Sequence, residues 1–232
     1  VGVAVISFPT LDGFQYVTLI SPIFIYVLLT KISGVNLLED HIVDLLLDVA
    51  ASGENLVERE GLSIKHESKF VLIGSGNPEE GELRPQLLDR FGLSVEVSSP
   101  RDVMQRVEVV KRRDAFDTDY ENFIAQWQLE DSKIRKKILS ARKLIKKVVM
   151  PDNIIDECAK LCIALGADGL RGELTLLRST RALAAFKGNK KAGRNHLKEV
   201  ATSALRHRLR RDPLDEAGST IRIQKIISEV LS

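Results

Sequence analysis

Apolar and polar residues follow regular periods along most of this chain, but not over its first thirty residues. That stretch carries a single charge, Asp12, and no charged residue lies between Phe14 and Thr30. Residues 17–29 are apolar enough for a membrane helix, although they fall short of the roughly 20 residues that a span needs and contain Pro22. A membrane anchor, buried strands and sequence foreign to the parent protein are the three interpretations, and we favour the last two.

Amphipathic patterning with charges throughout begins after Lys31. Residues 36–53 space their apolar side chains helically between a capping-type Asn36 and a final glycine, which predicts a helix of about four turns. Residues 56–65 alternate about a Glu-Gly pair and predict a β-hairpin. The continuous apolar run Phe70–Gly74 predicts a strand of a parallel sheet that is covered on both faces.

The pattern then changes from α/β to helical. A short helix over residues 85–91 and a second apolar strand, Leu93–Val97, complete a strand, loop, helix, strand order that is typical of α/β folds. From Pro100 onward the apolar spacing predicts helices over residues 100–115, 119–128, 132–147, 151–165, 171–187, 193–210 and 219–231. The chain is therefore predicted to join an α/β layer to a helical bundle.

The composition gives no support to several classes of function. Lys and Arg total 34 against 32 Asp and Glu, so the charge balance gives no general reason to expect nucleic acid or an anionic membrane as a partner. Cys158 and Cys162 lie four apart in a helical pattern and are interpreted as small buried side chains in a reducing compartment. The four histidines lack metal-ligand spacing, so no metal site is predicted. The basic run Arg206–Arg211 is interpreted as a charged helix end, with an interface or nucleic-acid patch as the alternative.

Three side chains are candidates for binding a phosphate or a water. Asn77 follows the end of a predicted strand, where ligands collect in open α/β sheets, or else it only begins a turn with Pro78. Arg90 either forms a structural ion pair with Asp89 or reaches the γ-phosphate of a neighbouring site. Arg171 lies in the first turn of a predicted helix and opposes its dipole, so it is either tolerated at the surface or retained for an anionic ligand.

Five segments carry long motifs, namely Asn36–His41, Gly74–Gly81, Leu83–Gly92, Gly169–Arg178 and His207–Gly218. Together they resemble magnesium chelatase subunit I, an AAA+ ATPase family, and residues 91–97 are closer to its bacteriochlorophyll type than to its plant and cyanobacterial type. The resemblance implies an α/β fold, a partial AAA+ P-loop NTPase core made of a parallel sheet with helices, followed by an all-helical lid. We divide the chain into a non-family apolar segment (1–35), the C-terminal part of the core (36–115), connecting helices (116–150) and the lid (151–232).

The resemblance also implies roles for the three candidates: Asn77 as sensor 1, Arg90 as an arginine finger acting in trans, and Arg171 as sensor 2 on the ATP phosphates. It implies a hexameric ring that uses ATP and Mg²⁺ and works with the family's D subunit and porphyrin-binding H subunit. ATP hydrolysis in this ring drives insertion of Mg²⁺ into protoporphyrin IX, a ligase reaction of chlorophyll and bacteriochlorophyll biosynthesis. The expected compartment is the bacterial cytoplasm, or the chloroplast stroma in a plastid-bearing organism, without a membrane or nucleic-acid partner.

Two motifs of the family have no counterpart in these 232 residues. The glycines at 74, 76 and 81 are not followed by the Gly-Lys-Ser/Thr ending of a phosphate-binding Walker A loop. Where the family has a Walker B Asp-Glu pair, the chain reads Thr30–Val35. A frameshift, a gene-model error or real divergence would each explain the change, and translating the upstream DNA in three frames would separate them. The alternatives to a motor subunit are a non-catalytic ring partner, a membrane-tethered relative and a degenerate or truncated MoxR-like homologue.

Without these motifs we expect the isolated chain neither to bind nor to hydrolyse ATP with normal affinity, because no residues hold the phosphates and magnesium of its own site. Titration with a fluorescent ATP analogue measures this directly. Binding in the micromolar range would contradict the expectation.

Overall fold

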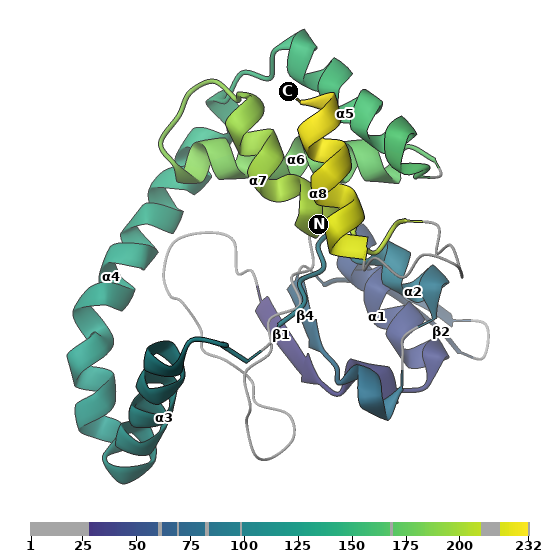
Figure 1. Ribbon diagram of the computed structural model, residues 1–232. Helices are drawn as coiled ribbons and strands as arrows, with labels where there is room; N and C mark the ends of the chain where they lie inside the picture. Colours follow the sequence, from purple (N-terminus) through teal and green to yellow (C-terminus); the bar gives the residue numbers. More distant parts are fainter. Residues whose placement is uncertain are drawn as a thin grey trace.

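The computed structural model describes residues 28–59, 62–68, 70–81, 84–97, 99–167, 169–209 and 219–231. Figure 1 shows an α/β layer that is joined through two long helices to a group of helices. The apolar stretch 14–30, to which the three interpretations apply, lies outside the described residues except at positions 28–30. Among the helices that are described, none combines the length and apolar character needed to cross a bilayer.

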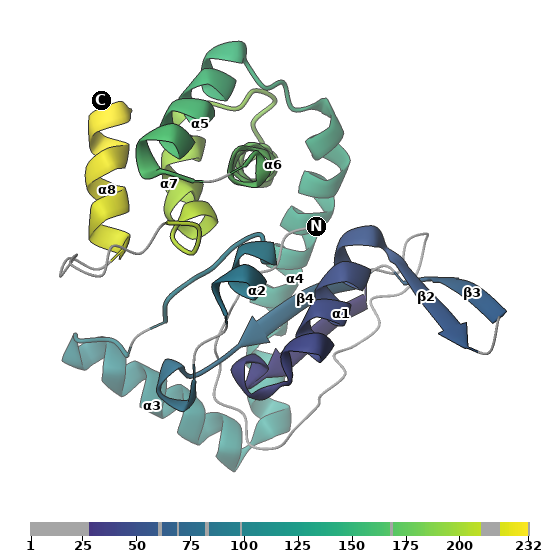
Figure 2. The ribbon, with the colours of Figure 1, turned by 90° about the vertical axis from the view of Figure 1, so that its right-hand side faces the viewer.

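A parallel pair of strands forms the centre of the α/β layer. Strand β1 (Leu28–Ser33) pairs with β4 (Phe70–Ser75) in register from Leu28 opposite Phe70 to Ser33 opposite Ser75. Helix α1 (Asp40–Ser52) packs against β4 (Figure 2). Their buried cluster consists of Ile32, Val35, Val43, Leu47, Ala50, Leu72, Leu87 and Phe91. The parallel strand predicted from the apolar run at residues 70–74 is confirmed.

The start of helix α1 differs from the prediction, whereas its end agrees with it. The helix begins at Asp40 instead of Asn36 because the Asn36 side chain is used elsewhere: its Nδ2 donates to the carbonyl oxygens of Asn77 and Gly81, each at 3.0 Å. The helix ends at Gly53, whose φ of 74° lies in the left-handed region that glycine adopts readily. Asn36, which the sequence predicted to cap this helix, therefore joins the loop before α1 to the loop after β4.

The predicted hairpin is present. Strands β2 (Glu54–Arg59) and β3 (Leu62–Glu67) are antiparallel, with Glu54 opposite Glu67 and Arg59 opposite Leu62. In Figure 2 the hairpin projects away from the layer formed by α1 and β4. The Glu-Gly pair of the predicted turn, at positions 60 and 61, lies outside the described residues.

Two elements were predicted after β4, a short helix and a strand, and only the helix is present in the described residues. Helix α2 (Pro85–Arg90) begins with proline at its first position, where the missing N–H removes no hydrogen bond. The strand predicted at residues 93–97 is absent from the described segment. The Ser94 N–H donates instead to the carbonyl oxygen of Ser203 in the helical bundle, at 2.8 Å. Of the apolar residues in this segment, Leu93 packs against the lid core, whereas Val95 and Val97 remain 42% and 56% exposed.

Two long helices connect the layer to the lid (Figure 1). Helix α3 (Val103–Thr118) is followed by α4 (Tyr120–Leu144), a single helix of 25 residues where the pattern predicted two. Neither helix buries a residue. The predicted break near residue 130 fails because Asp131 and Ser132 cost only a few tenths of a kcal/mol each in a helix interior, and no Gly or Pro is present there.

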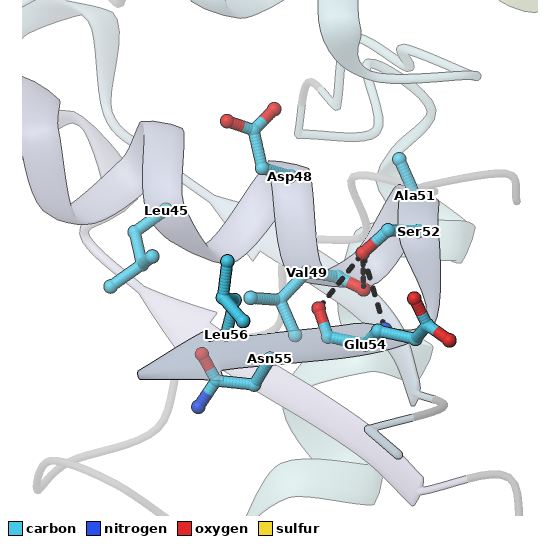
Figure 3. Close-up of a pocket in the computed structure, with 8 residues that line it drawn as sticks. All are labelled: Leu45, Asp48, Val49, Ala51, Ser52, Glu54, Asn55 and Leu56. Atoms are coloured by element: carbon cyan, nitrogen blue, oxygen red, sulfur yellow. Dashed lines mark hydrogen bonds between the residues drawn. The ribbon is translucent and has the colours of Figure 1, made fainter. Parts of the chain in front are cut away.

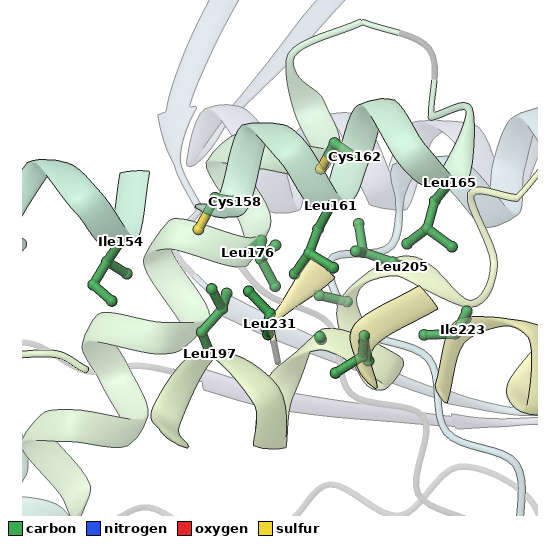
Figure 4. Close-up of a cluster of buried hydrophobic side chains, with 13 residues drawn as sticks. Ile154, Cys158, Leu161, Cys162, Leu165, Leu176, Leu197, Leu205, Ile223 and Leu231 are labelled. Carbon is green, nitrogen blue, oxygen red and sulfur yellow. The ribbon is translucent and has the colours of Figure 1, made fainter. Parts of the chain in front are cut away.

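The lid is a bundle built from α5 (Asp152–Leu165), α6 (Arg171–Phe186), α7 (Arg194–Leu205) and α8 (Ser219–Val230). Single turns of 3₁₀ helix lie elsewhere, at Val35–Leu37, Pro78–Glu80 and Ile145–Lys147. Figure 4 shows the lid core, in which side chains from all four helices meet. Cys158 and Cys162 are both buried there as free thiols, which confirms their predicted packing role.

The two thiols are expected to be unreactive in the folded protein. Burial, and then the nearby Glu157 and Glu173 carboxylates, raise the pKa of Cys158 to about 12, and burial raises the pKa of Cys162 to the same value. Since the thiolate is the nucleophile, only about one thiol in 10⁴ is reactive at pH 8. Labelling with a thiol-specific disulfide reagent should be slow in buffer and complete in denaturant. Labelling of the folded chain at the rate of free cysteine would contradict this.

Candidate functional site

The predicted sensor residue Asn77 lies two residues beyond the end of β4, in a loop held by Asn36. Asn77 Oδ1 accepts a hydrogen bond from the Glu79 N–H at 3.2 Å, which is the turn that the sequence offered as one interpretation. The backbone carbonyl oxygens of Asn77 and Gly81 both bind the Asn36 amide. A Cβ atom added to Gly76 would lie 2.5 Å from Asn36 Oδ1, so a side chain at this position would have to displace the Asn36 amide.

The sequence interpretation gave Asn36 only a capping role, so its part in this loop was missed. Its Oδ1 is buried, and no described group donates a hydrogen bond to it. An amide with one unpaired acceptor, facing the loop of Asn77, has capacity for a further donor such as water. Its spacing of 41 residues from Asn77 gave no local signal of the contact.

Arg90 does not pair with Asp89. Its Nη1 lies 2.7 Å from Asp44 Oδ1 and 2.6 Å from Asp48 Oδ1, two carboxylates on successive turns of α1. The Arg90 side chain remains 35% exposed. The structural ion pair that was one interpretation of Asp89 and Arg90 is therefore wrong, because the last turn of α2 directs the two side chains to different partners.

Asp89 binds the lid instead. Its Oδ2 lies 2.5 Å from Nη1 of Arg171, the first residue of α6, and its Oδ1 lies 3.4 Å from Nε of Arg208. Arg171 is 54% exposed, so its pair with Asp89 is accessible to solvent. The structure thus brings Arg171 beside the residue that precedes Arg90, whereas Asn77 belongs to the separate loop of Asn36 and Glu79.

The sequence interpretation favoured a charged helix end for the basic run at residues 206–211. The structure gives two of its arginines specific partners as well. Arg206 pairs with Glu96, and Arg208 is 3% exposed and surrounded by acceptors of residues 89–92. Composition alone cannot distinguish which basic residues of such a run are buried. The one available signal is the apolar Leu209 between them, which packs against the lid core.

His207 lies in the same contact. Its Nε2 is 2.9 Å from the Phe91 carbonyl oxygen and 2.5 Å from Arg208 Nη1, and one ring nitrogen cannot donate to the first and accept from the second at once. Burial, followed by repulsion from the Arg208 cation, lowers the pKa of His207 to about 4. The imidazole is therefore neutral near pH 7.

An open hollow of about 580 Å³ lies between α1 and β2 (Figure 3). Leu45, Val49 and Leu56 supply its apolar wall, and Asp48 lies at its rim. None of Asn77, Arg90 and Arg171 lines it. The hollow is thus distinct from the residues that the resemblance marks.

Different family models match the two ends of the chain. The family model described as "AAA lid domain" matches residues 155–230. A model described as "Protein of unknown function (DUF1295)" matches residues 1–48, which includes the first part of α1. The crystal structure of a proposed ATPase from Cytophaga hutchinsonii aligns with a TM-score of 0.64, covering 86% of this chain and 64% of that one at 18% identity, a likeness of fold alone. A parallel α/β layer followed by this helical lid defines an AAA+ protein.

Two curated relatives narrow the class. The magnesium-chelatase 38 kDa subunit of Cereibacter sphaeroides is 66% identical over 200 residues, or 86% of this chain and 60% of that protein. The magnesium-chelatase subunit ChlI of Cyanophora paradoxa is 45% identical over 201 residues, or 87% of this chain and 58% of that protein. The chain belongs to the family of the magnesium-chelatase 38 kDa subunit, and it spans about 60% of the length of these relatives. The higher identity to the bacterial subunit confirms the predicted subtype.

The pKa of His207 makes the folded chain sensitive to acid. Its folded pKa of about 4 is below the ordinary value of 6.5, so the unfolded chain binds the proton first and the free energy of unfolding falls as the pH drops from 6.5 to 4. At about 1.4 kcal/mol per pKa unit, the loss reaches roughly 3 kcal/mol. Urea unfolding at pH 7.5 and 4.5 should show a larger loss for the native chain than for His207→Gln. Equal losses would refute the assignment.

Proposed function

We propose that this chain acts in the ATPase motor of a magnesium chelatase, in which ATP hydrolysis is coupled to Mg²⁺ insertion into protoporphyrin IX. The observation that carries the proposal is the identity of 66% to a magnesium-chelatase 38 kDa subunit over 86% of the chain. In this proposal the chain enters a hexameric ring in the bacterial cytoplasm. The ring works with the D subunit and with the porphyrin-binding H subunit, so this chain does not itself bind the porphyrin.

Within the ring, Arg90 serves as the arginine finger of the neighbouring site, Arg171 as sensor 2 and Asn77 as sensor 1. Both arginines are paired with carboxylates here, and those pairs are at least partly exposed. Exposed ion pairs contribute only about 0–1 kcal/mol each, so the more highly charged phosphate groups of ATP can replace the carboxylates at small cost. The pairs therefore support a resting arrangement of these side chains that nucleotide exchanges.

The chain's own ATP site would also need acidic residues that position magnesium and activate water. Strand β1 ends at Ser33 and is followed by Gly34. By the resemblance, the family's Walker B Asp-Glu pair would fall within residues 30–35, and this stretch has neither acid. Neither a hydroxymethyl group nor a hydrogen atom can replace a carboxylate that positions magnesium or activates water. In the proposal, the chain supplies residues to a neighbour's site and lacks the acids of its own.

Ser33 and Gly34 also favour a second candidate, a ring partner that is not catalytic at all. Such a partner would occupy a place in the ring without stimulating its neighbour. The two candidates differ in whether Arg90 acts, and this difference can be measured.

The test is complementation of a ring that lacks its fingers. The Cereibacter sphaeroides 38 kDa subunit, with alanine in place of the arginine that matches Arg90, is mixed with this chain and its ATPase rate is measured. Since a finger contributes about 10³–10⁵ in rate, we expect the native chain to restore hydrolysis and Arg90→Ala to restore none. Arg84→Ala is the matched control, because Arg84 flanks the same helix and forms an exposed pair with Asp40.

Two outcomes would reject the motor role. Co-purification of the native chain with the ring, without any gain in hydrolysis, would establish the non-catalytic partner. Absence of co-purification would indicate a degenerate homologue that no longer assembles.

A further inference from the structure

Arg208 is a buried cation at the junction between the lid and the segment that carries Arg90. It follows helix α7, and its side chain is 3% exposed. Burying a guanidinium without partners is costly, so the position of its donors is informative. The two Nη atoms of Arg208 donate to carbonyl oxygens of residues 89–92 and of Ala204, and Nη1 also lies beside His207 Nε2. Its Nε makes no hydrogen bond in the described residues and lies 3.4 Å from the Asp89 carboxylate.

The acceptors are the last carbonyl groups of α2 and of the turn after it. Arg208 Nη2 donates to the Phe91 oxygen at 2.8 Å and to the Asp89 oxygen at 3.1 Å, and Nη1 donates to the Gly92 oxygen at 3.2 Å. Nη1 also lies 2.5 Å from the Ala204 oxygen. Carbonyl groups at a helix end lack partners within the helix, so Arg208 provides hydrogen bonds that α2 cannot supply itself.

The geometry of the guanidinium gives these bonds a positional effect. Its donors are fixed in one plane, so bonds to three carbonyl groups define the orientation of the backbone on both sides of Arg90. The Asp89 carboxylate, 3.4 Å from Arg208 Nε, balances the buried charge. Within the part of the chain that the structure describes, the Arg90 side chain pairs with the partly exposed carboxylates of α1.

We infer that Arg208 is a positioning residue for Arg90: it fixes residues 84–97, which we call the finger segment, on the end of lid helix α7. Two further contacts support this docking, the bond from the Ser94 N–H to the Ser203 oxygen at 2.8 Å and the pair of Arg206 with Glu96. In Figure 2, α2 lies directly beneath the lid helices.

Asp89 also links Arg208 to Arg171, the lid residue that is proposed to bind the nucleotide. Its two carboxylate oxygens bind Arg208 and Arg171 separately. When an anionic ligand draws Arg171 away from Asp89, the bonds from Arg208 keep the finger segment in place. Arg208 thus lets Arg171 exchange partners without releasing Arg90. This consequence rests on the proposed roles of Arg90 and Arg171, whereas the docking itself does not.

Hydrogen–deuterium exchange of the full chain tests the docking without any need for activity. In Arg208→Lys, which keeps the charge but loses the planar set of donors, we expect exchange in residues 84–97 to rise on the order of tenfold while α5 and α6 stay protected. Arg208→Met should show a larger rise. The matched control is Arg194→Met, which removes an arginine that pairs with Glu157 within the lid. Circular dichroism verifies that each variant is folded.

The complementation assay then tests the effect on the finger. Arg208→Lys should lower the kcat of the finger-deficient ring by about 10²-fold relative to the native chain, since misplacement by about 1 Å has such an effect. The KM for ATP should not change, because ATP binds to the neighbouring subunit.

Each result has a defined meaning. Unchanged exchange in the finger segment in both Arg208 variants, or an equal rise throughout the lid, would overturn the inference. Increased exchange confined to the finger segment, with native kcat in the ring, would also overturn Arg208 as a positioning residue for Arg90. If the native chain itself fails to complement, the proposed function fails, and the exchange data still decide whether Arg208 docks the segment.

Discussion

The two halves of the molecule meet at Phe91. Its ring is fully buried in the α/β core, while its carbonyl oxygen lies 2.8 Å from Arg208 Nη2 and 2.9 Å from His207 Nε2 of the lid. One residue therefore belongs to the packing of the sheet and to the hydrogen bonding of the lid. Because a single residue has only two soft backbone dihedrals, neither contact can move far without the other. Arg90 and Asp89 precede this point and take their positions from it.

Burial sorts the ion pairs of this junction into two groups. Arg208 is enclosed, and removing its partners would leave an uncompensated charge in a region of low dielectric. Arg90 and Arg171 keep access to water, which screens their carboxylate partners and makes those pairs weak. The permanent contact and the exchangeable contacts thus lie within a few residues of each other. This arrangement is suited to a protein in which ligands must enter and leave while the frame stays constant.

Local pattern was sufficient for elements whose partners are near in sequence. The hairpin at residues 54–67, the parallel strand at residues 70–75 and the lid helices follow from periodicity, glycine positions and apolar runs. Leu93–Val97 was misjudged because its alternation of apolar residues does not mark a strand: Leu93 packs on the lid core and Ser94 bonds to the lid backbone, while Val95 and Val97 stay exposed. The break expected within α4 failed because turn-forming residues at the surface cost a helix little.

The candidate site was predictable in part, since motif resemblance marked Asn77, Arg90 and Arg171. It did not mark the residues that hold them. Asn36 contacts the loop of Asn77 across 41 positions, and Arg208 reaches Phe91 across 117. Contacts at such separations are fixed by tertiary packing and leave no periodic trace in the chain. The contacts that hold the three marked residues in place were therefore found only from the structure.

The 25 residues of α4 have a mechanical consequence. At about 1.5 Å per residue the helix is a rod of about 37 Å, and its C-terminal part contacts lid helix α6. A tilt of about 10° at one end of such a rod moves the other end by about 6 Å, more than the pitch of one helical turn. A small rotation where α3 and α4 meet would thus be delivered to the lid as a displacement, which makes this exposed helix pair a lever arm.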